Sequence, residues 1–65
     1  MAMEQTETLH IDRYRLTSSS CLEAVREGRS STIDLWLCEG NRKQYLKTVE
    51  ANQVMLEVTA MRAKR

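Results

Sequence analysis

The chain has 65 residues, which allows one small domain at most and excludes a large enclosed substrate pocket. Its composition, with 42% hydrophobic residues, 29% charged residues and no proline, suits a folded helical protein rather than a disordered one. The net charge is only +1, although residues 1–40 carry an excess of acids and residues 41–65 an excess of bases. The three aromatic residues predict a thin core, so we expect oligomerisation to add stability.

The two cysteines and the first residues bear on location and on metal binding. Cys21 and Cys38 have neither the CxxC spacing nor the histidine companions of a structural zinc site. The start of the chain lacks the pattern of a secretion signal, and the apolar stretch Ile33–Cys38 is too short to cross a bilayer. We therefore expect a cytoplasmic protein with two buried thiols, no metal, no cofactor and no membrane contact. One disulfide is the alternative in an oxidising compartment.

In chain order, residues 1–8 are polar and predict a flexible N-terminus, followed by a single helical domain over residues 9–65. The stretch Leu9–Leu16 is ambiguous, because Leu9 and Ile11 alternate as in a strand while Arg13 breaks the phase. Its β-branched and aromatic residues favour an extended segment, and a short helix is the alternative.

The next stretch contains a helix-start signal. Ser20 followed by Glu23 forms a capping box, which predicts a helix over Cys21–Glu27 that ends at Gly28. The segment Ile33–Glu39 fits either a helix or a strand; helix is favoured, and a strand would pair with the first extended stretch.

The region Arg42–Lys64 has no glycine or proline and reads as one long helix with two apolar stripes. One stripe is predicted to form a dimer interface, in which a buried amide pair sets the register. The other, rich in methionine, is predicted to bind a partner. The alternative is that this stripe is buried against Leu22, Val25 and Trp36 while the first stripe forms the dimer. The dimer-interface residues are Tyr45, Leu46, Val49, Asn52, Gln53 and Leu56. The partner-binding residues are Val54, Met55, Val58, Met61 and Arg62.

Trp36 is expected in the core, with an interface position as the alternative. Catalysis is not expected, because His10 is the sole histidine and no nucleophile stands at a defined spacing from it. Nucleic-acid binding is the rival class, and its candidate contacts are Arg13, Arg15, Arg42, Lys43 and Lys47.

Taken together, the residues predict an all-α fold, with a long C-terminal helix through which two copies dimerise. The alternative fold is α+β, with a short N-terminal strand as in ribbon-helix-helix proteins. The predicted function is that of a non-catalytic regulator that binds and modulates a larger host protein such as a transcription regulator or an enzyme, as phage- or plasmid-borne accessory proteins do. Inhibition is the favoured direction of this regulation. The alternative function is a small dimeric DNA-binding transcriptional regulator.

Overall fold

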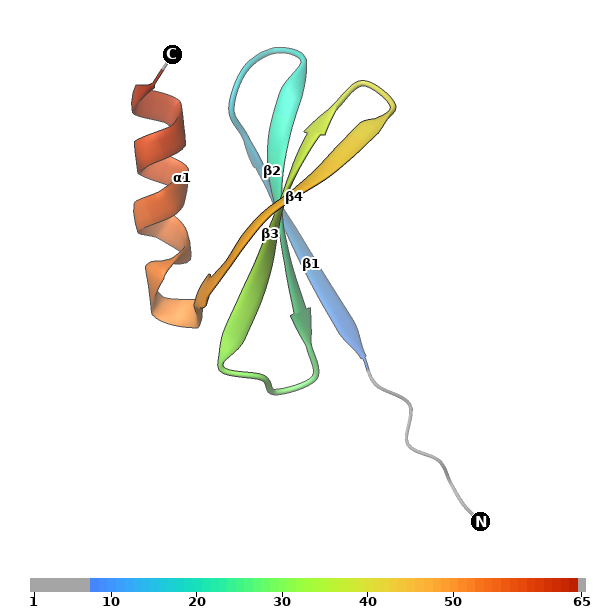
Figure 1. The fold of residues 1–65 in the computed structure, drawn as a ribbon, viewed down its shortest axis with the longest axis vertical. Coiled ribbons are helices and arrows are strands. Elements are labelled where there is room, and N and C mark those ends of the chain that lie inside the picture. Colours follow the sequence, from blue (N-terminus) through green and yellow to red (C-terminus); the bar gives the residue numbers. More distant parts are fainter. Residues whose placement is uncertain (1–7, 65) are drawn as a thin grey trace.

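The computed structural model describes residues 8–64 as an antiparallel sheet of four strands followed by a helix. Each strand pairs with the next in the chain, giving the order β1-β2-β3-β4 (Figure 1). The elements are β1 (Leu9–Arg15), β2 (Ser20–Glu27), β3 (Thr32–Glu39), β4 (Arg42–Glu50), the 3-10 turn η1 (Ala51–Gln53) and α1 (Val54–Ala63).

The predicted all-α fold is therefore wrong. The region Arg42–Lys64 does not form one helix: its first nine residues are β4, and only residues 51–63 are helical. The Gly40-Asn41 turn directs β4 back along β3, so its backbone groups pair with β3 rather than within a helix. Dimerisation through one long helix has no structural basis, because that helix does not exist.

The capping box at Ser20 is also wrong. Ser20 begins β2, and its hydroxyl lies 2.7 Å from the hydroxyl of Thr17 in the preceding turn. Leu22 and Ala24 point toward α1, while Glu23 points to the other face of the sheet. This alternation with period two is typical of a strand.

The prediction of an extended N-terminal stretch is confirmed, since β1 covers Leu9–Arg15. Its neighbour is β2 and not β3, so the expected pairing is wrong. The ribbon-helix-helix alternative is wrong as well, because strands follow β1 where that fold needs two helices. The flexible N-terminus was expected over residues 1–8, of which residues 1–7 lie outside the described residues.

Glycines shape two of the three connections between the described strands. Gly28 has φ of 54° and Gly40 has φ of 59°, values that favour glycine because it has no Cβ. Gly40 and Asn41 form a two-residue loop between the paired Glu39 and Arg42. A positive φ at the first loop position alone is typical of a type II′ turn, which matches the twist of the strands. Both glycines end strands, not helices.

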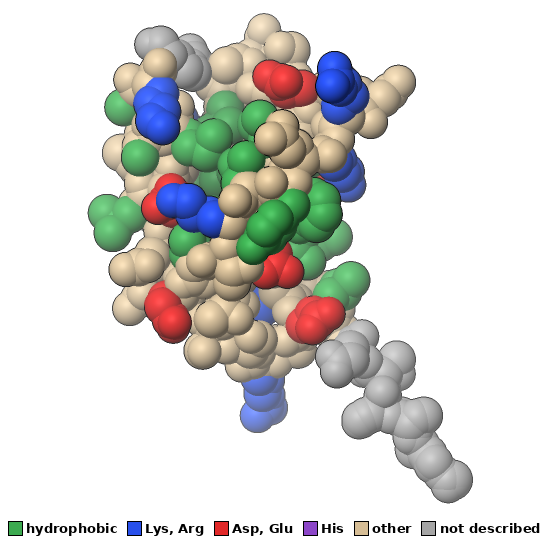
Figure 2. Space-filling view, viewed as in Figure 1, with side chains coloured by type: hydrophobic (Ala, Val, Ile, Leu, Met, Phe, Trp, Pro, Cys, Tyr) green, Lys and Arg blue, Asp and Glu red, His purple; other side chains and the backbone are tan. Residues whose placement is uncertain are grey.

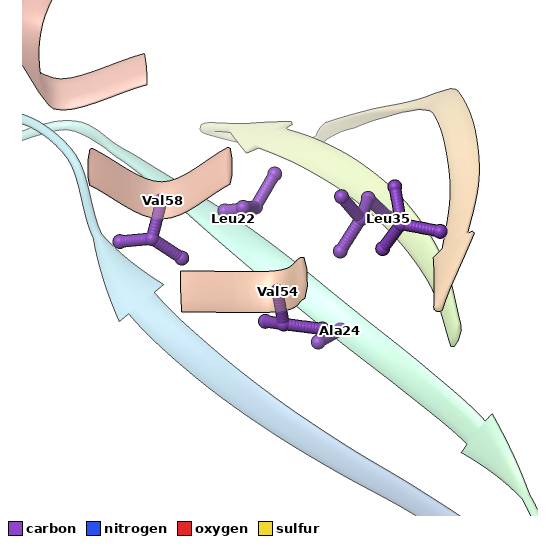
Figure 3. Close-up of a cluster of buried hydrophobic side chains, with 6 residues drawn as sticks. Leu22, Ala24, Leu35, Val54 and Val58 are labelled. Carbon is purple, nitrogen blue, oxygen red and sulfur yellow. The ribbon is translucent and has the colours of Figure 1, made fainter. Parts of the chain in front are cut away.

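The core lies between α1 and one face of the sheet (Figure 3). Val54 and Val58, one helical turn apart, point from α1 toward Leu22, Ala24 and Leu35 of the sheet. The buried residues are Leu22, Ala24, Leu35, Val49, Val54 and Val58. This set is small for an independent domain, as the composition predicted.

Val58→Ala should lower the free energy of unfolding by about 2 kcal/mol, because it removes two buried methyl groups and leaves a cavity. Leu56→Ala is the control on the same helix, where the side chain is 68% exposed. We expect that change to stay within about 0.5 kcal/mol. Chemical denaturation followed by circular dichroism measures both. A larger loss for Leu56→Ala would contradict the placement of α1.

Candidate functional site: the open face and free edge of the sheet

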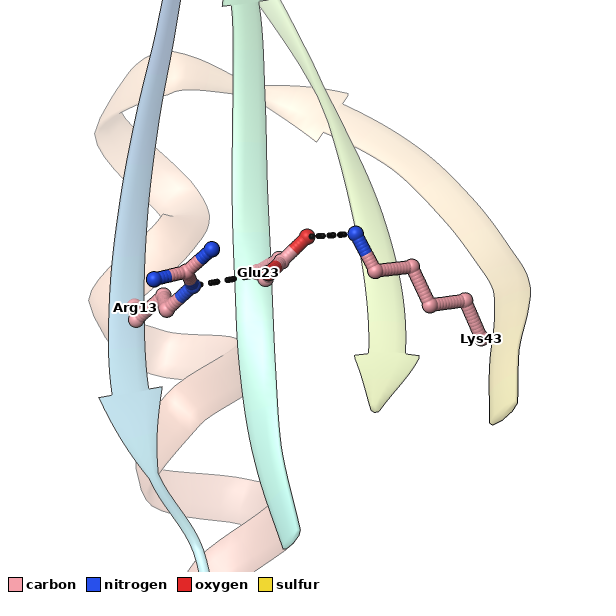
Figure 4. Close-up of polar contacts among 3 residues, drawn as sticks. All are labelled: Arg13, Glu23 and Lys43. Atoms are coloured by element: carbon pink, nitrogen blue, oxygen red, sulfur yellow. Dashed lines mark hydrogen bonds and ion pairs between the residues drawn. The ribbon is translucent and has the colours of Figure 1, made fainter. Parts of the chain in front are cut away.

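No described element covers the sheet face opposite α1, which we call the open face; α1 lies behind the sheet when this face is viewed (Figure 4). Strand alternation and register determine which side chains point to it. From β1 and β2 these are Leu9, Ile11, Arg13, Arg15, Cys21, Glu23, Val25 and Glu27. From β3 and β4 they are Thr32, Asp34, Trp36, Cys38, Lys43, Tyr45, Thr48 and Glu50.

The centre of the open face is apolar. Ile11, Val25 and Trp36 line a shallow hollow of about 290 Å³ together with Glu23 and Lys43. Ile11 is 47% exposed. A sheet face directed at water alone would carry polar residues at these positions. The apolar centre therefore marks a surface suited to burial by another molecule.

Two aromatic rings lie next to this hollow. The Trp36 and Tyr45 rings pack edge to face, with centroids 5.6 Å apart. The Tyr45 hydroxyl lies 2.6 Å from the Thr48 hydroxyl, which donates to Asp34 at 2.7 Å. These contacts hold the Tyr45 ring in place while 48% of the residue stays exposed. A fixed, exposed aromatic ring is well suited to binding, because little side-chain entropy remains to be lost.

Glu23 carries the one charged side chain that is buried among the described residues, at 4% exposure. Its carboxylate accepts a hydrogen bond from Arg13 Nε at 2.8 Å and forms an ion pair with Lys43 Nζ at 3.3 Å (Figure 4). The Arg13 hydrogen bond is the main cause that lowers the pKa of Glu23, against the opposing effect of burial. The cluster joins β1, β2 and β4 across the open face.

The charges on the open face nearly cancel. Arg13, Arg15 and Lys43 are its basic residues. Its acidic residues are Glu23, Glu27, Asp34 and Glu50, one more than the bases. Figure 2 shows one side of the whole molecule, α1 included, and there too acidic and basic side chains lie among apolar ones. The open face is therefore not a basic surface of the kind that attracts phosphate.

The two thiols lie at one end of the open face. Cys21 on β2 is directly opposite Cys38 on β3, and both are free and half-buried. They are close enough for a hydrogen bond between them, and burial is the main cause that raises the pKa of Cys38. A raised pKa keeps the thiol protonated and weakly reactive.

The predicted partner-binding stripe does not form one surface. Val54 and Val58 are core residues, and Met61 packs against the core. Met55 is 53% exposed, whereas Arg62 donates a hydrogen bond from its Nε to the Arg15 carbonyl oxygen at 2.9 Å.

The predicted dimer-interface residues are also dispersed. Val49 is a core residue and Leu46 packs against the core, while Tyr45 lies on the open face. Asn52 and Gln53 are in η1, and Leu56 is exposed on α1.

The candidate nucleic-acid contacts lie on both faces. Arg13, Arg15 and Lys43 share the open face, and two of them pair with Glu23. By alternation, Arg42 and Lys47 point to the other side, where Lys47 pairs with Glu57 at 3.3 Å. Three of the five cations are therefore neutralised by acids within the chain.

Within residues 8–64, no three His, Cys, Asp or Glu side chains gather as metal ligands would. In the same range, no helix has the length and apolar character needed to cross a membrane. Comparisons with protein-family models, curated proteins and solved structures found no match.

Sequence reasoning missed the central residues of the open face. Ile11, Glu23 and Val25 were not assigned to a site, and Trp36 was expected in the core rather than half-buried on this face. The sequence did contain one signal for this face, which is the strand-like alternation of residues 33–38. Its Asp34-Trp36-Cys38 side lies on the open face.

Acidification should destabilise the chain through Glu23. Because its pKa is lower in the folded chain than in the unfolded one, its stabilising contribution is present above the unfolded pKa of about 4.3 and is lost as pH falls through the folded value. Glu23→Gln should therefore differ more from the wild type at pH 7 than at pH 3. Thermal melts across this range measure the difference, with exposed Glu39→Gln as the control. Parallel curves for Glu23→Gln and wild type would contradict the role of Glu23.

Proposed function

We propose that this chain is a homodimeric, non-catalytic interaction module that binds a larger protein through the open face of its sheet. The observation that carries the proposal is the uncovered apolar centre formed by Ile11, Val25 and Trp36 beside the exposed ring of Tyr45. Protein interfaces commonly combine an apolar, aromatic centre with charged groups at the rim.

The charge pattern favours a protein partner over nucleic acid. A nucleic-acid surface gains most of its affinity from cations that neutralise phosphates. Here Arg13 and Lys43 already neutralise Glu23, and the acids of the open face outnumber its bases. Arg15 and the unpaired acids at the rim instead provide both signs of charge for orienting a protein surface.

The proposed mode of action is occupancy of a functional surface on an enzyme or a transcription regulator. That protein is inhibited if the open face covers the surface through which it binds its own substrate or partner. This is how phage- or plasmid-borne accessory proteins act on host proteins, and a cytoplasmic location is part of the proposal. The centre of the sheet offers affinity by apolar burial, while the charged rim offers selectivity.

Affinity capture from a lysate of the source cells, done with and without nuclease treatment, tests the proposal. Tyr45→Lys places a charge at the aromatic position of the open face and should abolish capture of a stoichiometric protein partner. Leu56→Lys introduces the same charge on the exposed side of α1 and should leave capture intact. Melting curves of both variants verify that they remain folded.

Three outcomes would overturn the assignment. Equal capture by both variants would remove the open face as the site. Loss in Leu56→Lys alone would move the site to α1. Recovery of nucleic acid without a protein partner in untreated lysate, lost at moderate salt, would favour the DNA-binding alternative.

A further inference from the structure

The free edge of β1 presents backbone groups at every second residue. Thr8 accepts a backbone hydrogen bond from Gly28 at 2.7 Å, and Leu16 donates one to Ser20 at 3.0 Å. The even-numbered residues of this stretch therefore face β2, and those between them direct their N–H and C=O groups away from it. The outward residues of β1 are Leu9, Ile11, Arg13 and Arg15.

One end of this edge is already occupied. Arg62 of α1 donates its Nε–H to the outward carbonyl oxygen of Arg15. Among the described residues, no backbone partner meets the outward groups of Leu9, Ile11 and Arg13. An unpaired row of this kind is a template for another strand, and Ile11 lies at its middle.

The opposite edge of the sheet is protected. β4 has a register shift beside Leu46, and a bulge is a device that prevents strand addition at an edge. Cations are a second such device, but both edge strands carry them, three in β4 and two in β1. β1, by contrast, pairs with β2 over seven consecutive positions without a shift. The regular edge is therefore the one on which a strand would dock.

We propose that two copies of the chain pair antiparallel through β1, with Ile11 opposite Ile11 of the partner subunit on the two-fold axis. This register places Leu9 opposite the partner's Arg13. In a directly opposed pair of this type, each residue donates its N–H to the carbonyl oxygen of the other, which gives two hydrogen bonds. The pairing therefore provides partners for the outward N–H and C=O groups of Leu9, Ile11 and Arg13 in both copies. The inference deepens the homodimer part of the proposed function and rests on that part alone.

The side chains support this register. On the face that carries α1, His10 comes to lie opposite the partner's Asp12, a pair of complementary polarity. A shift of two residues in one direction places His10 opposite the partner's His10, and a shift in the other places Asp12 opposite the partner's Asp12. Two Asp12 carboxylates directly opposite each other are unfavourable, and two opposed His10 rings lose the complementary partner that Asp12 provides. On the open face, Leu9 packs along the aliphatic stem of the partner's Arg13.

The pairing also has a geometric consequence. The two-fold axis through Ile11 runs perpendicular to the sheet, so two four-stranded sheets become one sheet of eight strands. Both α1 helices lie on one side, and the two open faces join on the other. Only a short strand is shared, so the dimer should be weak and dependent on concentration, with an interface below about 1,200 Å².

Analytical ultracentrifugation of the full chain under reducing conditions, over roughly 1 to 500 µM, tests the pairing. The wild type should show a monomer–dimer equilibrium. Ile11→Lys brings two cations together on the axis and should raise the dissociation constant at least about tenfold. Tyr45→Lys adds the same charge to the same face at the far edge and should leave the constant unchanged. Circular dichroism verifies that both variants fold.

A charge exchange tests the register independently. His10→Asp places acids opposite each other in its homodimer, and Asp12→Lys places bases opposite each other. Each variant alone should dimerise less than the wild type. Mixed together, they should form a heterodimer, because the carboxylate introduced at position 10 of one copy then opposes the ammonium introduced at position 12 of the other. The unchanged Asp12 of the first copy opposes the unchanged His10 of the second. No gain on mixing would overturn this register.

The outcomes separate the pairing from the wider proposal. A wild type that stays monomeric at every concentration would overturn both the β1 pairing and the homodimer. Dimers lost equally in Ile11→Lys and Tyr45→Lys would overturn the β1 pairing in favour of face-to-face packing, and the homodimer would stand. The capture experiment reads target binding separately, because Tyr45→Lys should lose the target while remaining dimeric.

Discussion

The arrangement of this molecule depends on one constraint: α1 can cover only one of the two faces of the sheet. α1 buries Val54 and Val58, and no other element among residues 8–64 covers the opposite side. An antiparallel sheet tolerates this arrangement when its second face is polar. Here that face has Ile11, Val25 and Trp36 at its centre. The fold therefore completes a small core and leaves a second apolar surface on the other side of the sheet, and this surface is the basis of the proposed interaction function.

The buried carboxylate of Glu23 determines the character of that second surface. A charge with so little exposure needs compensation, and Arg13 and Lys43 supply it from two other strands. The same contacts pair two of the three cations of the open face with Glu23. The burial of Glu23 would destabilise the fold without these partners, and with them it fixes the positions of two long side chains around the hollow. It also removes the excess positive charge that nucleic-acid binding would require.

The sequence allowed the extended stretch at residues 9–16 to be predicted, and Gly28 and Gly40 do mark the ends of elements. The helical interpretation of residues 42–50 failed for a local reason. The bulge beside Leu46 adds a residue to β4, so Leu46 and Val49 both point toward α1 although they are three positions apart. That spacing imitates the period of a helix. The Glu23 cluster could not be predicted, because it depends on the register of strands β1, β2 and β4, which no local pattern encodes.

The edge of β1 and the open face require different chemistry from a binding partner. The edge of β1 needs hydrogen-bond donors and acceptors at a strand repeat, which a second copy provides in matching number. The open face needs apolar burial and charges of both signs, which a protein surface of another kind provides. Because edge pairing leaves Tyr45 and Trp36 uncovered, the two forms of association do not compete. Joining two open faces on one side of a continuous sheet presents the binding surface twice, so a target that engages both copies is held more tightly than either face alone could hold it.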